Sequence, residues 1–436
     1  MQGASWTEAQ AESYLRSLEL FGMRFGLDRM RRLMTALGSP QQRYDCVHVL
    51  GTNGKTSTTR MIAAILQRHG LRTAAYTSPH LVSYRERLQV GEHDLTAEQF
   101  AAAVAQAARA AERVNRTLAG DDHVTQFELL TAAALWQIAE QDVQVGVVEA
   151  GLGGRYDATA VIDAQVTVLT NVGLEHTRWL GPTVHDIAEE KLAVVREGGT
   201  LVLGAGLAPE ALAVAERVAG ERHAQIFIAE DGDGSLGEGA LAANGAFQRR
   251  NFALARLACE RYLHDAGIEL DERAVRDAAA ATAVPGRLQV VSEDPLTVLD
   301  GAHNPDAVAA LVESLGALVG SRPLALVLGV LEDKDAVGML GPLLGLCERA
   351  WFTAPPSERA LSPAALQSLA RQLGFEHVVC EPLPARALAE AQAWALERGG
   401  AVLATGSVYL VGDLLAEVHA GGHTQDSQAP RRRATR

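Results

Sequence analysis

The clearest chemical signal in the sequence is a glycine-rich segment with one lysine and several hydroxyl side chains, GTNGKTS at residues 51–57. A strand-like apolar run (44–50) precedes it, and a helical apolar stripe within residues 57–68 follows it. At such a strand-to-helix turn the glycines let the backbone wrap a phosphate, and the helix N-terminus directs N–H dipoles at the anion. Lys55 would neutralise the β- and γ-phosphate oxygens, and Thr56 or Ser57 would bind phosphate or Mg²⁺. The segment therefore predicts a nucleoside triphosphate site.

The spacing within this loop narrows the class of protein. Gly51 and Gly54 alone would be interpreted as turn residues, and Lys55 as a solvated charge, but here strand, loop, lysine and hydroxyl pair occur together. The pattern is GxxGKT, two residues shorter than the GxxxxGK[ST] of motors, kinases and GTPases. The loop thus favours a nucleotide-binding protein outside those groups.

Two further polar residues lie just beyond predicted strands, where the chemistry of parallel sheets gathers. Glu149 ends the apolar run 143–149 and precedes a glycine cluster. A carboxylate beside a triphosphate is a natural Mg²⁺ ligand because hard cations prefer oxygen. His176 follows the strand-like run 166–170. The alternatives are that Glu149 is a solvated loop acid and that His176 is structural. Because both residues occur together with the phosphate loop, we favour a functional site.

Lys191 is unusual because it falls on the apolar stripe of a predicted helix at 183–196. It lies four residues after Ile187 and seven after Val184. An inward lysine needs a partner or a lowered pKa, since burial disfavours its charged form. Snorkelling of the side chain to the surface is the alternative.

These residues require a scaffold that brings strand ends together. Strand-like runs alternate with helix-period segments nearly throughout, which predicts an α/β fold. We expect an N-terminal P-loop ATPase-type domain with a central parallel sheet at 1–287, a smaller Rossmann-like C-terminal domain at 288–420, and a disordered tail at 421–436. The predicted strands are 44–50, 73–77, 143–149, 166–170 and 200–203, then 288–291, 297–299, 324–328, 350–353 and 401–404.

Composition argues against several classes of partner. Lys and Arg number 39 against 53 Asp and Glu, a net charge of −14, whereas nucleic-acid binding needs clustered basic residues. No run approaches the roughly 18 apolar residues of a membrane-spanning helix, and the N-terminus lacks the layout of a signal peptide. We therefore expect a cytoplasmic protein.

The four cysteines share no CxxC spacing and are predicted to be buried free thiols.

A series of motifs, each weak alone, occurs in one order along almost the whole chain. They are GTNGKTS at 51–57, TSPHL at 77–81, ER at 86–87, EAGLGGRYDAT at 149–159, TNVGLEHTRWLG at 170–181, EEK at 189–191, PGRL at 285–288, DGAHNP at 300–305 and GSVYLVGDL at 406–414. This series resembles the folylpolyglutamate synthase/dihydrofolate synthase family of the Mur ligase superfamily. The short phosphate loop fits that superfamily.

The resemblance implies roles for single residues. ATP would be bound by Thr52, Asn53, Gly54, Lys55, Thr56, Ser57, Asn251, Arg287, Asp300 and His303. One or two Mg²⁺ ions would be held by Ser78, Glu149, His176 and Lys191, the last in the carbamylated form that this family carries. The catalytic residues would be Lys55, Lys191, His176 and His303. A K⁺ ion is also compatible with the resemblance.

The resemblance also implies the other substrates and the reaction. A folate or dihydropteroate would be bordered by Gly22, Met23, Thr125, Gln126, Phe127, Glu128, Tyr156, Asp157 and Ala158, with Phe127 stacking on its ring. Its carboxylate would attack the γ-phosphate of ATP to give an acyl phosphate, and the amine of L-glutamate would then displace phosphate to form an amide. The enzyme is expected to be a monomer.

Departures from the common family pattern keep two alternatives in view. Thr56 stands where this family often has glycine, and a threonine there is closer to the cell-wall Mur ligases. Tyr156 and Ala160 stand where Leu and Asn are usual in the substrate region. A cell-wall ligase is the nearest alternative, although the fifty residues before Gly51 leave little room for a nucleotide-sugar domain. The other is a P-loop ATPase that forms no amide bond, in which Glu149, His176 and Lys191 would be structural.

Overall fold

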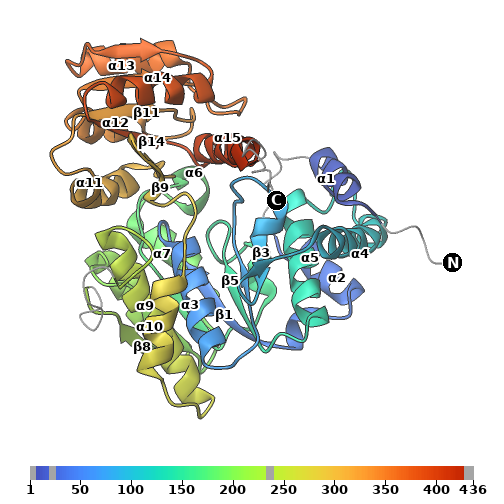
Figure 1. The fold of residues 1–436 in the computed structure, drawn as a ribbon. Coiled ribbons are helices and arrows are strands. Elements are labelled where there is room, and N and C mark those ends of the chain that lie inside the picture. Colours follow the sequence, from blue (N-terminus) through green and yellow to red (C-terminus); the bar gives the residue numbers. More distant parts are fainter. Residues whose placement is uncertain (1–5, 19–25, 232–239, 427–436) are drawn as a thin grey trace, which may run out of the picture. The chain divides into compact units, whose positions relative to one another are not determined.

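The computed structural model describes residues 6–18, 26–231 and 240–426, with side chains to residue 419. The chain forms two compact units (Figure 1). The first comprises Met1–Ala242 and Gln248–Ala283, and the second comprises Ala243–Phe247 and Val284–Arg436. Residue 287, the predicted boundary, lies within the second unit, close to its junction with the first.

The first unit is built on an eight-stranded sheet. Its strands are β1 Asp45–Leu50, β2 Thr73–Tyr76, β3 Leu88–Val90, β4 His93–Asp94, β5 Val145–Glu149, β6 Val166–Leu169, β7 Thr200–Leu203 and β8 Gln225–Ile228. They are arranged β4-β3-β2-β5-β1-β6-β7-β8, and all neighbours are parallel except at β2–β3 and β3–β4. The carboxyl ends of the central strands β5, β1 and β6 therefore meet at one edge of the sheet.

Helices cover both faces of this sheet. They are α1 Glu8–Ser17, α2 Asp28–Ala36, α3 Lys55–Arg68, α4 Ala97–Asn115, α5 Gln126–Glu140, α6 Thr177–Leu180, α7 Val184–Leu192, α8 Pro209–Glu221, α9 Ala246–Asp265 and α10 Glu272–Ala281, with short 3₁₀ turns η1 Pro40–Gln42, η2 Tyr84–Arg87 and η3 Ala158–Val161. Buried side chains of α1, α2, α4 and α5 pack on Ala74, Tyr76 and Val148 of the sheet. Helices α3, α9 and α10 lie together on the opposite side (Figure 1).

The second unit has a six-stranded sheet in the order β13-β12-β11-β14-β10-β9. Its strands are β9 Gln289–Glu293, β10 Leu296–Leu299, β11 Leu324–Leu328, β12 Arg349–Phe352, β13 Val378–Cys380 and β14 Ala401–Thr405. Only β9 pairs in the antiparallel direction within this sheet as described. The helices of the unit are α11 Pro305–Val319, α12 Ala336–Leu344, α13 Pro363–Gln372, α14 Pro384–Leu396 and α15 Val408–Asp426.

The predicted α/β class, with a parallel central sheet followed by a second α/β domain, is confirmed. Strands 200–203 and 324–328 have the predicted bounds, and the other predicted strands shift by one or two residues at their ends. Strands β3, β4, β8 and β13 were not predicted because they are short and their side chains, Leu88 apart, are exposed or half-buried, which gives weak apolar patterns. Strands β4, β8 and β13 are also edge strands. Helix α15 runs past the predicted start of the tail to Asp426, and residues 427–436 lie outside the described residues.

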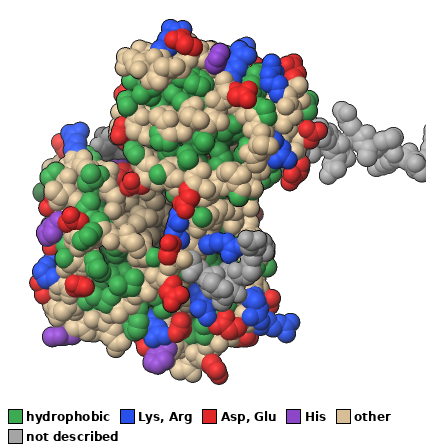
Figure 2. All heavy atoms as spheres, turned by 90° about the vertical axis from the view of Figure 1, so that its left-hand side faces the viewer, with side chains coloured by type: hydrophobic (Ala, Val, Ile, Leu, Met, Phe, Trp, Pro, Cys, Tyr) green, Lys and Arg blue, Asp and Glu red, His purple; other side chains and the backbone are tan. Residues whose placement is uncertain are grey.

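Charged side chains of both signs lie on the surface. Figure 2 presents one face of the molecule, where basic and acidic side chains of the described residues are interspersed rather than gathered into one basic patch.

Among the helices that the structure describes, none combines the length and apolar character needed to cross a bilayer. The four cysteines are free as predicted, but Cys380 is exposed rather than buried because it ends the edge strand β13.

Candidate active site

The phosphate loop connects β1 to α3, as the sequence predicted, and two of its glycines cannot be replaced without a collision. Gly51 has φ +144°, and a Cβ there would lie 1.8 Å from Thr170 Oγ1. Gly54 has φ +82°, a left-handed conformation that L side chains disfavour. The loop is tied to the end of β6, because Asn53 N donates to Asn171 Oδ1 at 2.9 Å and Thr170 Oγ1 donates to Asn53 O at 2.6 Å. The motif 170–173 thus holds the shape of the loop.

Two lysines converge on one carbonyl of this loop. Lys55 Nζ donates to Gly51 O at 3.1 Å and to Thr52 O at 3.0 Å, and Lys191 Nζ donates to Gly51 O at 2.9 Å. Lys191 is buried in α7, which confirms its inward position. Burial, and then the charge of Lys55, lower the pKa of Lys191 from 10.5 to about 7. Two lysine amines, one from α3 and one from α7, therefore meet at the loop, and the lowered pKa leaves much of the Lys191 amine neutral near pH 7.

Glu149 lies at the carboxyl end of β5 and is buried beside the phosphate loop. Its carboxylate accepts from Thr56 Oγ1, at 3.0 Å to each oxygen, and from the backbone N of Ser78 at 3.1 Å. Three residues predicted for the ATP and metal sites are thus brought together. The hydroxyl of Thr56, which stands where the family often has glycine, is directed at the carboxylate.

His176 is placed differently from these residues. It is the N-cap of α6 with φ 54°, its side chain is 38% exposed, and its Nε2 lies 3.9 Å from Glu175 Oε1. In the part of the chain that the structure describes, no three His, Cys, Asp or Glu side chains form a cluster suited to a metal ion.

The donor chemistry of the predicted metal residues fits Mg²⁺. A buried carboxylate and two nearby residues with hydroxyl groups can supply oxygen donors, which a hard cation prefers. Glu149 and Ser78 meet in the structure, whereas the amine of Lys191 is directed at Gly51 O. The full metal set stays a prediction.

Asn251, far away in sequence on α9, reaches the phosphate loop. A Cβ on Gly54 would lie 2.5 Å from Asn251 Oδ1, so the amide group packs directly on this glycine. Asn251 Nδ2 donates to Gln248 Oε1 at 3.0 Å, which orients the amide. The structure thereby joins Asn251 to residues 51–57, next to which the resemblance had put it.

The glycine-rich segment after β5 meets two of the residues predicted to border the folate-type substrate. A Cβ on Gly151 would lie 2.4 Å from Phe127 Cζ and 3.1 Å from Asp157 Oδ2. Phe127 and Asp157 therefore face one another across Gly151. Tyr156 is 48% exposed, and Ala158 is buried at the start of η3.

Loop 151–157 also reaches α7. A Cβ on Gly154 would lie 2.4 Å from the backbone O of Lys191, and Arg155 N donates to Glu190 O at 2.8 Å. Arg155 Nε also donates to Glu190 Oε1 at 2.9 Å. One loop thus connects the Phe127–Asp157 pair with the helix that carries Lys191.

The other predicted substrate residues at the start of α5 are held by the protein itself. Thr125 caps the helix, and Gln126 Nε2 donates to Leu15 O at 2.7 Å. Glu128 accepts from Arg29 Nε at 3.1 Å on both oxygens. Of this group, Phe127 is the one that meets Gly151, and Gly22 and Met23 lie outside the described residues.

The second unit brings its three predicted site residues together at the end of β10. Asp300 is buried, and its carboxylate accepts from Leu288 N and Ala302 N, each at 2.8 Å. Burial raises the pKa of Asp300, and the guanidinium of Arg287 opposes that rise. Arg287 Nη1 lies 2.4 Å from where a Gly301 Cβ would be, and the Nδ1 of His303 donates to Gly301 O at 2.9 Å. All three surround one glycine.

Sequence reasoning missed the buried polar residues of the first unit that contact the predicted substrate-binding residues Glu128 and Asp157. Arg29 joins the buried Glu128 and the partly exposed Asp122 in an ion network. His48 forms a hydrogen bond with Thr159, and Thr159 in turn donates to Asp157. His48 could have been noticed, since it interrupts the apolar run 44–50, but its partner is 111 residues away and no local pattern indicates it.

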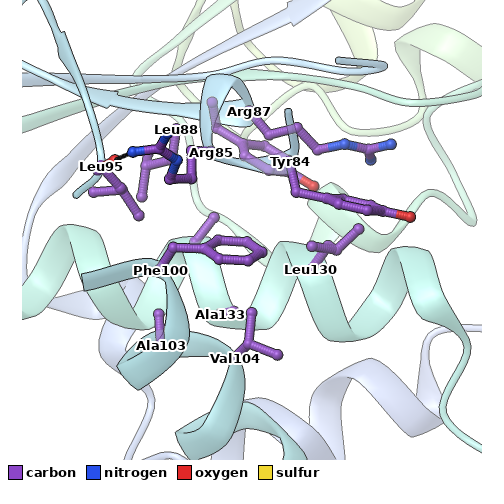
Figure 3. Close-up of a pocket in the computed structure, with 12 residues that line it drawn as sticks. Tyr84, Arg85, Arg87, Leu88, Leu95, Phe100, Ala103, Val104, Leu130 and Ala133 are labelled. Carbon is purple, nitrogen blue, oxygen red and sulfur yellow. Dashed lines mark hydrogen bonds between the residues drawn. The ribbon is translucent and has the colours of Figure 1, made fainter. Parts of the chain in front are cut away.

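A small cavity lies elsewhere in the first unit, among η2, α4 and α5 (Figure 3). Its lining includes Tyr84, which stacks on Phe100 with ring centroids 6.3 Å apart, and Leu130. The volume of about 20 Å³ holds roughly one water molecule. Its lining residues include none of those predicted for the ATP, metal or folate sites.

Two family models match the chain. The Mur ligase middle domain matches residues 49–206, which include the phosphate loop, Glu149, His176 and Lys191. The Mur ligase glutamate ligase domain matches residues 286–408, which include Arg287, Asp300 and His303. Each predicted catalytic residue thus lies in a matched region.

Curated relatives cover most of the chain. Folylpolyglutamate synthase from Lacticaseibacillus casei is 35% identical over 362 residues, 78% of this chain and 84% of the relative. Dihydrofolate synthase/folylpolyglutamate synthase from Bacillus subtilis is 34% identical over 372 residues, 80% of this chain and 86% of the relative.

Solved structures agree in fold. Mycobacterium tuberculosis folylpolyglutamate synthase complexed with ADP has a TM-score of 0.87 at 30% identity, covering 94% of this chain and 98% of that one. Escherichia coli FolC in complex with DHPP and ADP has a TM-score of 0.83 at 30% identity, covering 97% of this chain and 100% of that one.

Proposed function

This chain belongs to the folylpolyglutamate synthase/dihydrofolate synthase family of Mur ligases, and we propose that it is an ATP-dependent ligase that joins L-glutamate to a folate-type carboxylate. The observation that carries the proposal is the phosphate loop with Lys55 and, hydrogen-bonded to its Thr56, the buried carboxylate of Glu149. Relatives with this architecture bind ADP, and one binds ADP together with DHPP.

The residues of the first unit account for the charge handling that the reaction needs. The substrate carboxylate attacks the γ-phosphorus of ATP, and the bond from that phosphorus to the bridging oxygen breaks. The products of this step are an acyl phosphate and ADP. Lys55 Nζ exchanges the Gly51 and Thr52 carbonyls for phosphate oxygens, which bind a cation more strongly. The amine of glutamate then adds to the acyl carbon, loses a proton and expels phosphate, leaving an amide.

Magnesium belongs to the same proposal. Ser78, Glu149, His176 and Lys191 would hold one or two ions, and a bound ion would supply neutralisation of the phosphate charge. Arg287, Asp300 and His303 of the second unit are proposed to contribute to ATP binding. A K⁺ ion, a monomeric state and a cytoplasmic location stay predictions.

Lys191 is proposed to carry a carbamate. Its neutral amine adds to CO₂, forming an N–C bond and releasing a proton, and the product is a carboxylate with oxygen donors for a cation. The lowered pKa of about 7 supports this, because a substantial fraction of the amine is neutral at physiological pH. Native mass spectrometry with ¹³C-bicarbonate should show the adduct in the wild type and none in Lys191→Met.

The test of function is an acceptor assay with purified protein, ATP, Mg²⁺ and radiolabelled glutamate. Dihydropteroate, tetrahydrofolate and a UDP-muramyl acceptor are compared, and the chain lengths of the products are resolved. We expect incorporation with one or both pteridine acceptors and none with the muramyl acceptor. Incorporation with the muramyl acceptor alone would support the cell-wall ligase, and acceptor-independent ATP hydrolysis alone would support a non-ligase ATPase.

A further inference from the structure

Asp157 is held by a chain of hydrogen bonds that begins in the centre of the sheet. Its Oδ1 accepts from Thr159 N at 3.0 Å and from Thr159 Oγ1 at 2.5 Å, and its Oδ2 accepts from Leu152 N at 2.8 Å. His48 Nε2 lies 2.8 Å from Thr159 Oγ1. All the side chains in this chain are buried.

The direction of the chain follows from counting protons. The hydroxyl of Thr159 has one proton, and the carboxylate of Asp157 receives it. Thr159 Oγ1 must therefore accept from His48, which places a proton on His48 Nε2. Burial lowers the pKa of His48 to about 4, so the ring is neutral at physiological pH and carries a single N–H. Histidine, threonine and carboxylate form one relay in which each group fixes the next.

The relay connects parts of the first unit that matter to the substrate. His48 is on β1, three residues before Gly51, and pairs in register with Val148 and Thr167 of the neighbouring strands. Asp157 lies at the other end, across Gly151 from the ring of Phe127. A buried histidine in a central strand costs desolvation that an apolar side chain would avoid. Stability alone is therefore a weak reason for it.

We propose that His48 and Thr159 are positioning residues for the ring of the acceptor, holding the carboxylate of Asp157 in a fixed orientation beside Phe127. This rests on the proposed function. A folate-type ring is planar and carries adjacent N–H donors, which one aromatic face and one fixed carboxylate can recognise together. Without the Thr159 hydroxyl, Asp157 Oδ1 keeps only the backbone N–H of Thr159, so the carboxylate is held less firmly and its alignment with Phe127 is weakened.

The experiment compares Thr159→Val, which keeps the shape and removes the hydroxyl, with Thr159→Ser, which restores it. Acceptor binding by calorimetry without ATP is measured beside the KM for acceptor and for ATP. We expect Thr159→Val to weaken acceptor binding and raise the acceptor KM about 10- to 100-fold, because a buried carboxylate loses a partner. The KM for ATP should change less than about twofold, and Thr159→Ser should lie near the wild type.

Thr167→Val is the matched control, because Thr167 is equally buried on the strand next to His48. It should leave acceptor binding unchanged. Should Thr159→Val not fold, His48→Leu tests the relay from its other end, with an expected loss of about 3- to 10-fold in acceptor binding. His48→Gln keeps an N–H donor and should restore much of it.

Three results would overturn the inference. Thr159→Val could leave acceptor binding unchanged, or it could weaken ATP binding as much as acceptor binding. Thr159→Ser could fail to restore acceptor binding. A wild type that binds acceptor but ligates no glutamate would remove the proposed function, and the variants' binding constants would still decide on the relay. A wild type that binds no pteridine acceptor would overturn both.

Discussion

Two ends of the first unit hold their charged groups in opposite ways. At the phosphate end, residues 51–57 with Lys191, the two lysine amines donate to neutral backbone carbonyls. At the ring end, Phe127 and Asp157 with His48 and Thr159, the carboxylate already receives hydrogen bonds on both oxygens. Carbonyls are weaker partners for a cation than phosphate is. The phosphate end is thus arranged to exchange its partners for a ligand, whereas the ring end is arranged before the ligand arrives.

The glycines at the two ends also differ, in their backbone conformation and in the groups that crowd them. At the phosphate end, Gly51 and Gly54 have positive φ and are crowded by polar groups, Thr170 Oγ1 and the Asn251 amide. At the ring end, Gly151 has no left-handed backbone and is crowded by the tip of the Phe127 ring. Substitutions at the first end therefore distort backbone and anion site together, and those at the second displace one side chain.

The largest effect should come from Lys55→Ala. Removing the amine leaves the developing phosphate charge without its lysine partner, so kcat/KM for ATP in glutamate ligation should fall about 10³-fold. Acceptor binding without ATP should be unchanged, since Lys55 belongs to the phosphate end. Arg68→Ala, at the other end of α3, is the control and should retain full activity. Ligation at the wild-type rate in Lys55→Ala would contradict the proposed mechanism.

Gly54→Ala should follow, with a fall of about 10²-fold in kcat/KM for ATP because the new methyl group displaces the Asn251 amide and the loop. Gly70→Ala is a matched control. Gly70 has φ +84°, close to the +82° of Gly54, but nothing lies within 4 Å of its Cβ position. Both variants should lose about 1 kcal/mol of stability from the left-handed backbone, and only Gly54→Ala should lose activity. Equal losses of activity would mean that crowding at Gly54 has no role.

The ring end makes stability depend on pH through His48. The folded pKa of about 4 lies below the ordinary 6.5, so the unfolded chain binds more protons between these values and stability rises with pH across that window. On acidification from pH 7 to pH 4.5, the wild type should lose about 2 kcal/mol that a non-titrating residue would not lose. Urea unfolding of wild type and His48→Gln at both pH values measures this difference. Parallel losses in the two proteins would show that His48 is not held neutral.

The smallest effect is expected for Gly151→Ala. Its methyl group would meet Phe127 Cζ at 2.4 Å, and the ring, as a side-chain tip, can turn aside. The KM for the acceptor should rise about tenfold with the KM for ATP unchanged. Gly220→Ala, in α8 with open space around its Cβ position, should be silent in both. A rise in the KM for ATP instead would mean that the two ends are not separable.

Local patterns carried much of the prediction. The phosphate loop, the strand that leads into it and the inward Lys191 each follow from periodicity or spacing within about a dozen residues, and the structure has them as predicted. Thr125, Gln126 and Glu128 were predicted as substrate neighbours from the family resemblance alone. The structure directs Gln126 and Glu128 at Leu15 and Arg29, which a motif does not reveal.

The sequence by itself determined the α/β class, the short phosphate loop and the order of the motifs, because each depends on neighbours along the chain. Only the tertiary structure decided that two lysines share the Gly51 carbonyl, that Asn251 covers Gly54, and that His48 supports Asp157. These contacts join residues up to 197 positions apart, from Gly54 to Asn251. Their geometry depends on which strands become neighbours in the sheet, a choice made by packing of the whole unit rather than by any local pattern.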